Sequence, residues 1–142
     1  MRDRIDLAPD QAAESRPVVL VVEDEVMIRH VVAAYLRDSG FTVVEAVNAS
    51  EAKELLASHN EVDIVFSDIL MPEGIDGFAL ADWIDKHCEG LPLLLTSGSH
   101  AARSKAEGRQ FISKPYIYIQ LEKRLREMLG LPLRPSIDDL PA

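Results

Sequence analysis

Hydrophobic and polar positions follow two alternating patterns along this chain. Five short runs hold clusters of apolar residues, and the first of them, PVVLVV, is apolar at every position, which is typical of a central strand buried on both faces of a parallel sheet. These runs lie at residues 17–22, 41–46, 62–68, 92–98 and 110–113. Between and after them, apolar residues recur every three or four positions, which predicts amphipathic helices. The pattern therefore predicts five strands, each followed by a helix.

The predicted helices have recognisable ends. In the first helix, apolar residues recur at three- and four-residue spacing, and Gly40 follows as a helix stop. The residues concerned are Ile28, Val31, Val32, Tyr35 and Leu36. Asn48, with Glu51 three residues later, is a capping-box-like start to the second helix. The last helix is amphipathic and closes at a glycine.

Alternating strands and helices imply right-handed crossovers and an open, twisted parallel sheet with helices on both faces. This is a three-layer α/β fold, and we place it in one domain at residues 16–130. Residues 1–15 are polar and lack a sustained period, so we expect a disordered N-terminal tail. Residues 131–142 hold three prolines and two adjacent acids, which predicts a C-terminal tail.

Composition limits the classes of protein to consider. With 142 residues, 47% hydrophobic and 27% charged, the chain is typical of one globular domain. Its net charge of -9 argues against non-specific DNA binding. Cys88 is the single cysteine and fits a reducing compartment. No apolar run is long enough to span a bilayer and the N-terminus lacks a secretory signal, so we expect a cytoplasmic protein that does not bind a membrane.

Candidate chemistry lies at the carboxyl ends of the predicted strands, where open α/β sheets bind ligands. Six polar residues lie there: Glu23, Asp24, Asp68, Thr96, Ser97 and Lys114. Three converging carboxylates repel one another unless a cation joins them. Oxygen ligands suit Mg²⁺, and the scattered histidines disfavour a transition metal. A divalent cation beside an ammonium and a hydroxyl can hold a phosphoryl group, which an aspartate carboxylate can accept.

Four motifs carry a resemblance to a known family. They are VVEDE after the first strand, FSDILMP at the third, LPLLLTSG at the fourth and FISKPY at the fifth. In this order and spacing they make the chain resemble the response-regulator receiver domain of two-component signalling, over roughly residues 16–130. The resemblance implies a flavodoxin-like sheet of five strands in the order 2-1-3-4-5.

The resemblance assigns roles to the acidic residues. Asp68 matches the phosphoacceptor, and Pro72 follows it at the family's spacing. Glu23 and Asp24 match the acidic pair that holds Mg²⁺, with Asp24 as a direct ligand and Glu23 acting through water. Asp68 itself and the backbone carbonyl of Leu70 would complete the protein ligands of the ion.

It also assigns roles on the fourth and fifth strands. Ser97 matches the switch hydroxyl, and Thr96 is the alternative for that role. Lys114 matches the lysine that pairs with a phosphoryl oxygen, and the bond from Lys114 to Pro115 resembles the family's cis peptide. Phe111 matches the aromatic residue whose rotamer follows phosphorylation, although a core residue would show the same pattern.

Two departures from the family pattern concern loops. The segment MPEGIDG has one residue more between Pro72 and Gly77 than the commonest form, so we expect a reshaped loop after the third strand. Only residues 99–109 separate the switch hydroxyl from the fifth strand, so we expect a shortened fourth helix, frayed or even absent.

Basic residues concentrate towards the C-terminus, where residues 101–142 hold eight Lys and Arg against five Asp and Glu. The residues concerned include Arg103, Lys105, Arg109, Lys123, Arg124 and Arg126. A solvated helix face explains any one of them. As a group they suggest a surface for an acidic partner or for a second copy, which would form a homodimer through the fourth strand, the fifth strand and the last helix.

The resemblance implies a stand-alone signalling receiver rather than an enzyme, because few residues follow residue 130. A histidine kinase or histidine phosphotransfer protein would donate a phosphoryl group to Asp68 with Mg²⁺, and the modified domain would present a changed protein-interaction face. Two alternatives stay open. One is a pseudo-receiver that only docks partners. The other is a phosphatase of the haloacid dehalogenase type, which is disfavoured because Leu70 occupies the position of its acid/base aspartate.

Overall fold

The computed structural model describes residues 16–58, 61–71 and 76–134 of the chain. Its strands are β1 (Val18–Val22), β2 (Thr42–Ala46), β3 (Ile64–Asp68), β4 (Leu93–Ser97) and β5 (Phe111–Ser113). Its helices are α2 (Val26–Asp38), α3 (Ala49–Ser58), α4 (Gly77–His87), α5 (His100–Lys105) and α6 (Tyr118–Leu129). The expected N-terminal tail, Pro72 and residues 135–142 lie outside the described residues.

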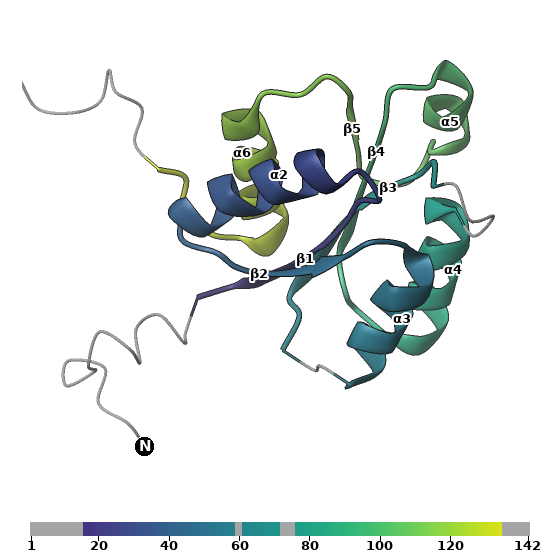
Figure 1. Cartoon of the computed structure of the whole chain (residues 1–142), viewed down its shortest axis with the longest axis horizontal. Helices are drawn as coiled ribbons and strands as arrows, with labels where there is room; N and C mark the ends of the chain where they lie inside the picture. Colours follow the sequence, from purple (N-terminus) through teal and green to yellow (C-terminus); the bar gives the residue numbers. More distant parts are fainter. Residues whose placement is uncertain (1–15, 59–60, 72–75, 135–142) are drawn as a thin grey trace, which may run out of the picture.

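All five strands are parallel and lie in the order β2-β1-β3-β4-β5, which confirms the predicted flavodoxin-like topology. Helices α2 and α6 cover one face of the sheet, and α3, α4 and α5 cover the other (Figure 1). Along β1, Val19 and Val21 pack beneath α2 and α6, whereas Leu20 and Val22 face α3 and α4. Burial on both faces explains why the central strand β1 is apolar at every position.

The buried stripe of α2 matches the apolar pattern of the sequence only in part. Ile28 and Val31 are exposed, and Arg29 is buried beside Val32, Ala33 and Leu36. The pattern includes exposed positions because apolar residues occupy more than one face of this helix, so their spacing does not fix which face meets the sheet. Arg29 could not be recognised as a core-facing residue from hydropathy.

The start of α3 and the length of α5 agree with the sequence. The Asn48 carboxamide oxygen accepts the N–H of Glu51 at 2.9 Å, and the Glu51 carboxylate accepts the N–H of Val47 at 3.0 Å, so the capping interaction before α3 is confirmed. Helix α5 has only six residues and is capped by Ser99, which accepts the N–H of Ala102. The expected shortening of the fourth helix is therefore confirmed.

The chain turns back after α6 at Gly130, whose φ of 69° is left-handed. Arg134 then donates two hydrogen bonds to the buried Glu122 carboxylate, at 2.6 and 2.7 Å. Burial alone would raise the pKa of Glu122, but hydrogen bonds from Arg134, Arg126 and Tyr35 outweigh it and lower that pKa. The first residues of the expected C-terminal tail are thus held against α6.

Candidate functional site

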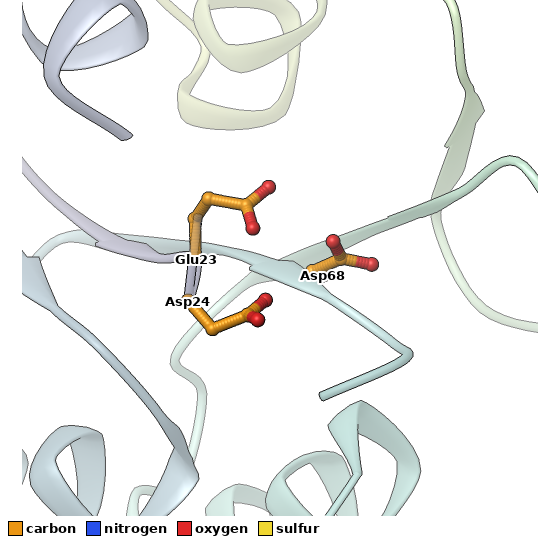
Figure 2. A group of neighbouring side chains, drawn as sticks. All are labelled: Glu23, Asp24 and Asp68. Carbon is orange, nitrogen blue, oxygen red and sulfur yellow. The ribbon is translucent and has the colours of Figure 1, made fainter. Parts of the chain in front are cut away.

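Three carboxylates meet at the carboxyl edge of the sheet (Figure 2). Glu23 and Asp24 directly follow β1, and Asp68 is the last residue of its neighbour β3. One oxygen from each side chain lies within 4.8 Å of the others. Glu23 and Asp68 are only 6% and 7% exposed, so their mutual repulsion is weakly screened by solvent.

Lys114 supplies the nearest positive charge. It follows β5, and its ammonium donates to Asp68 Oδ2 at 2.7 Å and to Glu23 Oε1 at 3.2 Å. Burial would lower the pKa of Lys114, but the hydrogen bond and charge of Asp68, joined by those of Glu23, outweigh it and raise that pKa. Lys114 is therefore a fixed cation between two of the carboxylates.

The carboxylates keep an excess of negative charge despite Lys114. Burial raises the pKa of the Glu23 carboxyl, and the negative charge of nearby Asp68 raises it further. The hydrogen bond from the N–H of Glu25 and the positive charge of Lys114 lower it, but the net shift is upward. Three carboxylates against one ammonium leave two negative charges uncompensated at full ionisation. A divalent cation with hard oxygen ligands matches this donor set, so the residues present fit Mg²⁺.

The hydroxyl groups at the end of β4 have different partners. Thr96 donates to the carbonyl of Ile112 on β5 at 2.7 Å, so its hydroxyl is used within the sheet. Ser97 is buried one residue further along, and its Oγ accepts the N–H of Ser99 at 3.1 Å. Of the two, Ser97 is the better candidate for contact with a ligand, because its hydroxyl hydrogen is not committed to a strand carbonyl.

The remaining predicted residues lie around this edge. The Lys114–Pro115 peptide bond is cis. Phe111 is half-buried and packs with Leu95, Ala102 and other residues beneath α5. The N–H of Leu70 donates to Asp68 Oδ1 at 3.3 Å, and the Leu70 side chain is 56% exposed. Metal binding by the Leu70 carbonyl stays a prediction, as does a rotamer switch at Phe111.

The sequence did not single out Gly77 as part of the site, yet it packs against the backbone of Asp68 and Ile69. A Cβ built on Gly77 would lie 2.6 Å from the backbone oxygen of Asp68 and 2.7 Å from Cα of Ile69. The N–H of Gly77 also donates to the carbonyl of Ile69 at 2.8 Å. Only glycine allows α4 to begin this close to the end of β3. The one signal in the sequence is the glycine that ends MPEGIDG.

The basic residues near the C-terminus do not form one free surface. Arg109 pairs with Asp82 and Asp85 at 3.2 and 2.8 Å. Arg124 donates to the carbonyl of Phe111, and Arg126 donates to that of Ser39. Arg103, Lys105 and Lys123 are exposed. Docking of an acidic partner or a second copy on this side stays a prediction.

Comparison with known proteins agrees with this arrangement. The family profile described as "Response regulator receiver domain" matches residues 19–126, and the chain belongs to this family. The chain is 34% identical over 120 residues to the response regulator Rre1 of Synechocystis sp.; the match covers 79% of this chain and 51% of Rre1. The chain therefore spans about half the length of that relative. Receiver domains are signalling modules that interact with histidine kinases or phosphotransfer proteins.

Solved receiver structures share the fold. The receiver domain of NtrX from Brucella abortus is 33% identical, with a TM-score of 0.71, and the match covers 79% of this chain and 98% of that one. The response regulator TrrA from Thermotoga maritima, solved in a complex with Mg²⁺-BeF, is 28% identical with a TM-score of 0.73, covering 80% and 99%. Among the described residues, no helix is long and apolar enough to cross a membrane.

Proposed function

We propose that Asp68 accepts a phosphoryl group from a phosphohistidine on a histidine kinase or a histidine phosphotransfer protein. The observation that carries this proposal is the buried Asp68 carboxylate, held by Lys114 at 2.7 Å and grouped with Glu23 and Asp24. An oxygen of Asp68 attacks phosphorus, the bond from phosphorus to the donor's imidazole nitrogen breaks, and the leaving imidazole keeps that electron pair and takes up a proton from water.

The chain's own residues have distinct parts in this transfer. Glu23, Asp24 and Asp68 would hold Mg²⁺, which when bound neutralises charge on the carboxylates and on the phosphoryl oxygens. Lys114 gives up its contact with Asp68 to pair with a phosphoryl oxygen. Ser97 donates its hydroxyl hydrogen to another phosphoryl oxygen. Because these contacts exist only with the phosphoryl group, they shift the domain towards a second conformation.

Exposed apolar side chains beside the acceptor form a docking face for the donor protein. Met27 near the start of α2 is 69% exposed, and Ile117 just before α6 is 61% exposed. The two helices follow β1 and β5, whose ends are joined by the hydrogen bond from Lys114 to Glu23. Exposed apolar side chains at the sheet edge that carries a reactive carboxylate are typical of a protein-interaction site. Its place at the acceptor favours the phosphodonor as the occupant.

Transfer from a phosphohistidine donor tests both parts of the proposal. Asp68→Asn should abolish transfer from a radiolabelled donor protein. Met27→Glu should slow transfer from the protein donor by about tenfold while leaving uptake from a small phosphodonor unchanged. Leu133→Glu, at an exposed apolar residue after α6, is the matched control and should leave both reactions unchanged. Unimpaired transfer to the Met27→Glu variant would contradict the docking face alone.

The two other functions make different predictions for the same reaction. A phosphatase would release phosphate in repeated turnovers, for which an acid/base group is needed where this chain has the exposed Leu70. A domain that only docks partners would take up no phosphoryl group at all. We expect one phosphoryl group per chain and no sustained release of phosphate.

A further inference from the structure

A buried guanidinium lies next to the acidic cluster and belongs to none of the roles above. Arg29 on α2 is 7% exposed. Its Nη1 donates to the backbone carbonyl of Glu23 at 2.9 Å, and its Nε donates to the Glu45 carboxylate on β2 at 3.2 Å. Burying a charge costs several kcal/mol before its partners offset the cost. Filling the space beneath α2 does not require an arginine, because an apolar side chain of similar volume would fill it.

The bond to the Glu23 carbonyl fixes a peptide at the centre of the site. That carbonyl shares its peptide plane with the N–H of Asp24, so its direction sets how the chain leaves β1 and where the Asp24 side chain starts. The rest of Glu23 is held as well: its N–H donates to Ala46 on β2 at 3.1 Å, and its carboxylate accepts the N–H of Glu25 at 3.0 Å. Arg29 holds the one remaining polar group of this residue.

We propose that Arg29 is a positioning residue for the metal site: by holding the Glu23 carbonyl it fixes the directions of the Glu23 and Asp24 carboxylates before Mg²⁺ binds. The inference rests on the proposed function, since it concerns the affinity of the same acidic cluster. Removing a residue that orients the metal ligands through hydrogen bonds, without touching the ion itself, changes the metal affinity by about 10- to 100-fold. We expect an effect at the lower end of that range, because Glu23 keeps its other hydrogen bonds.

Arg37 provides a matched control on the same helix. It donates to the same Glu45 carboxylate at 3.2 Å, and it also donates to the carbonyl of Val43 at 3.1 Å. It makes no hydrogen bond to Glu23. Losing Arg37 therefore removes a cation and a Glu45 contact, as losing Arg29 does, but leaves the Glu23 carbonyl held.

The test measures Mg²⁺ dissociation constants by isothermal titration calorimetry, with urea unfolding in EDTA as a parallel measure of stability. Arg29→Met should weaken Mg²⁺ binding by about tenfold, whereas Arg37→Met should change it by less than about twofold. Saturating Mg²⁺ should restore phosphoryl uptake by the Arg29→Met variant, because the acceptor and Lys114 are intact. Arg29→Lys should weaken binding by about threefold, because a flexible ammonium lacks the rigid planar fork through which two guanidinium nitrogens reach the two acceptors.

Four results would contradict the positioning role of Arg29 or the proposed function beneath it. If Arg29→Met lowers stability but binds Mg²⁺ as tightly as the wild type does, Arg29 is a structural residue and the inference is overturned. If Arg29→Met does not fold, Arg29→Lys decides, and a dissociation constant unchanged from that of the wild type overturns the inference. Equal weakening by Arg29→Met and Arg37→Met would overturn it as well. Wild-type protein that takes up no Mg²⁺ would instead overturn the proposed function.

Discussion

Repulsion among the carboxylates should lower the stability of the fold in the absence of Mg²⁺, and bound Mg²⁺ should raise it. The variant Asp24→Asn separates these two effects. Two unit charges 4.8 Å apart repel by about 3 kcal/mol at an effective dielectric constant of 20 and by about 1 kcal/mol in water. Asp24 is partly exposed and Lys114 neutralises part of the cluster. We therefore expect Asp24→Asn to stabilise the fold in EDTA by about 1 kcal/mol, or about 3 °C in Tm.

Mg²⁺ should reverse this order. At a concentration of 100 times its dissociation constant, a ligand adds about 2.7 kcal/mol to the stability of the protein that binds it. The wild type should gain this stability, and Asp24→Asn should gain almost none. Urea unfolding followed by the fluorescence of Trp83, in EDTA and in Mg²⁺, measures both effects.

A control variant removes the same charge elsewhere. Glu54→Gln lies on the exposed side of α3 and should change neither the stability in EDTA nor the gain from Mg²⁺. The reasoning is refuted if Asp24→Asn is less stable than the wild type in EDTA, or if it gains as much stability from Mg²⁺ as the wild type does.

Three further predictions concern the surroundings of the site. Gly77→Ala should lower stability by about 1–3 kcal/mol in urea unfolding, because its Cβ would meet the Asp68 backbone. Arg134→Met should cost about 1–2 kcal/mol at neutral pH. Because the pKa of Glu122 is lowered in the folded state, that difference should be present above the ordinary carboxyl pKa and vanish as the pH falls through the folded value, as acid titrations would show. Leu70→Asn should shorten the lifetime of the aspartyl phosphate, because a polar side chain admits water beside Asp68; an unchanged decay rate would contradict this.

The sequence was sufficient to predict the sheet and the residues at its edge. The run 17–22 is apolar at consecutive positions, the run 62–68 has three apolar residues in a row, and the polar residues at or after their ends mark where each strand ends. In parallel sheets, those ends share one edge, so Asp24, Asp68 and Lys114 could be placed together before their distances were known. The short α5 could be predicted in the same way, from the number of residues available.

Contacts between distant segments could not be predicted in this way. Whether Arg29 or Ile28 faces the sheet depends on the rotation of α2, which hydropathy left undetermined. Arg134 follows the last helix in a proline-containing segment without helical periodicity, yet it binds the buried Glu122. Such charged residues are buried only because their partners come from elsewhere in the chain, and a local pattern carries no record of those partners.

The central claim is that Asp68, with its acidic neighbours and Mg²⁺, accepts a phosphoryl group. Intact-mass spectrometry of the protein after incubation with a small phosphodonor tests it most directly. With Mg²⁺ we expect the wild type to gain the mass of one phosphoryl group, and Asp68→Asn or an excess of EDTA to abolish the gain. A wild-type protein whose mass stays unchanged, or an Asp68→Asn variant that gains the same mass, would contradict the account.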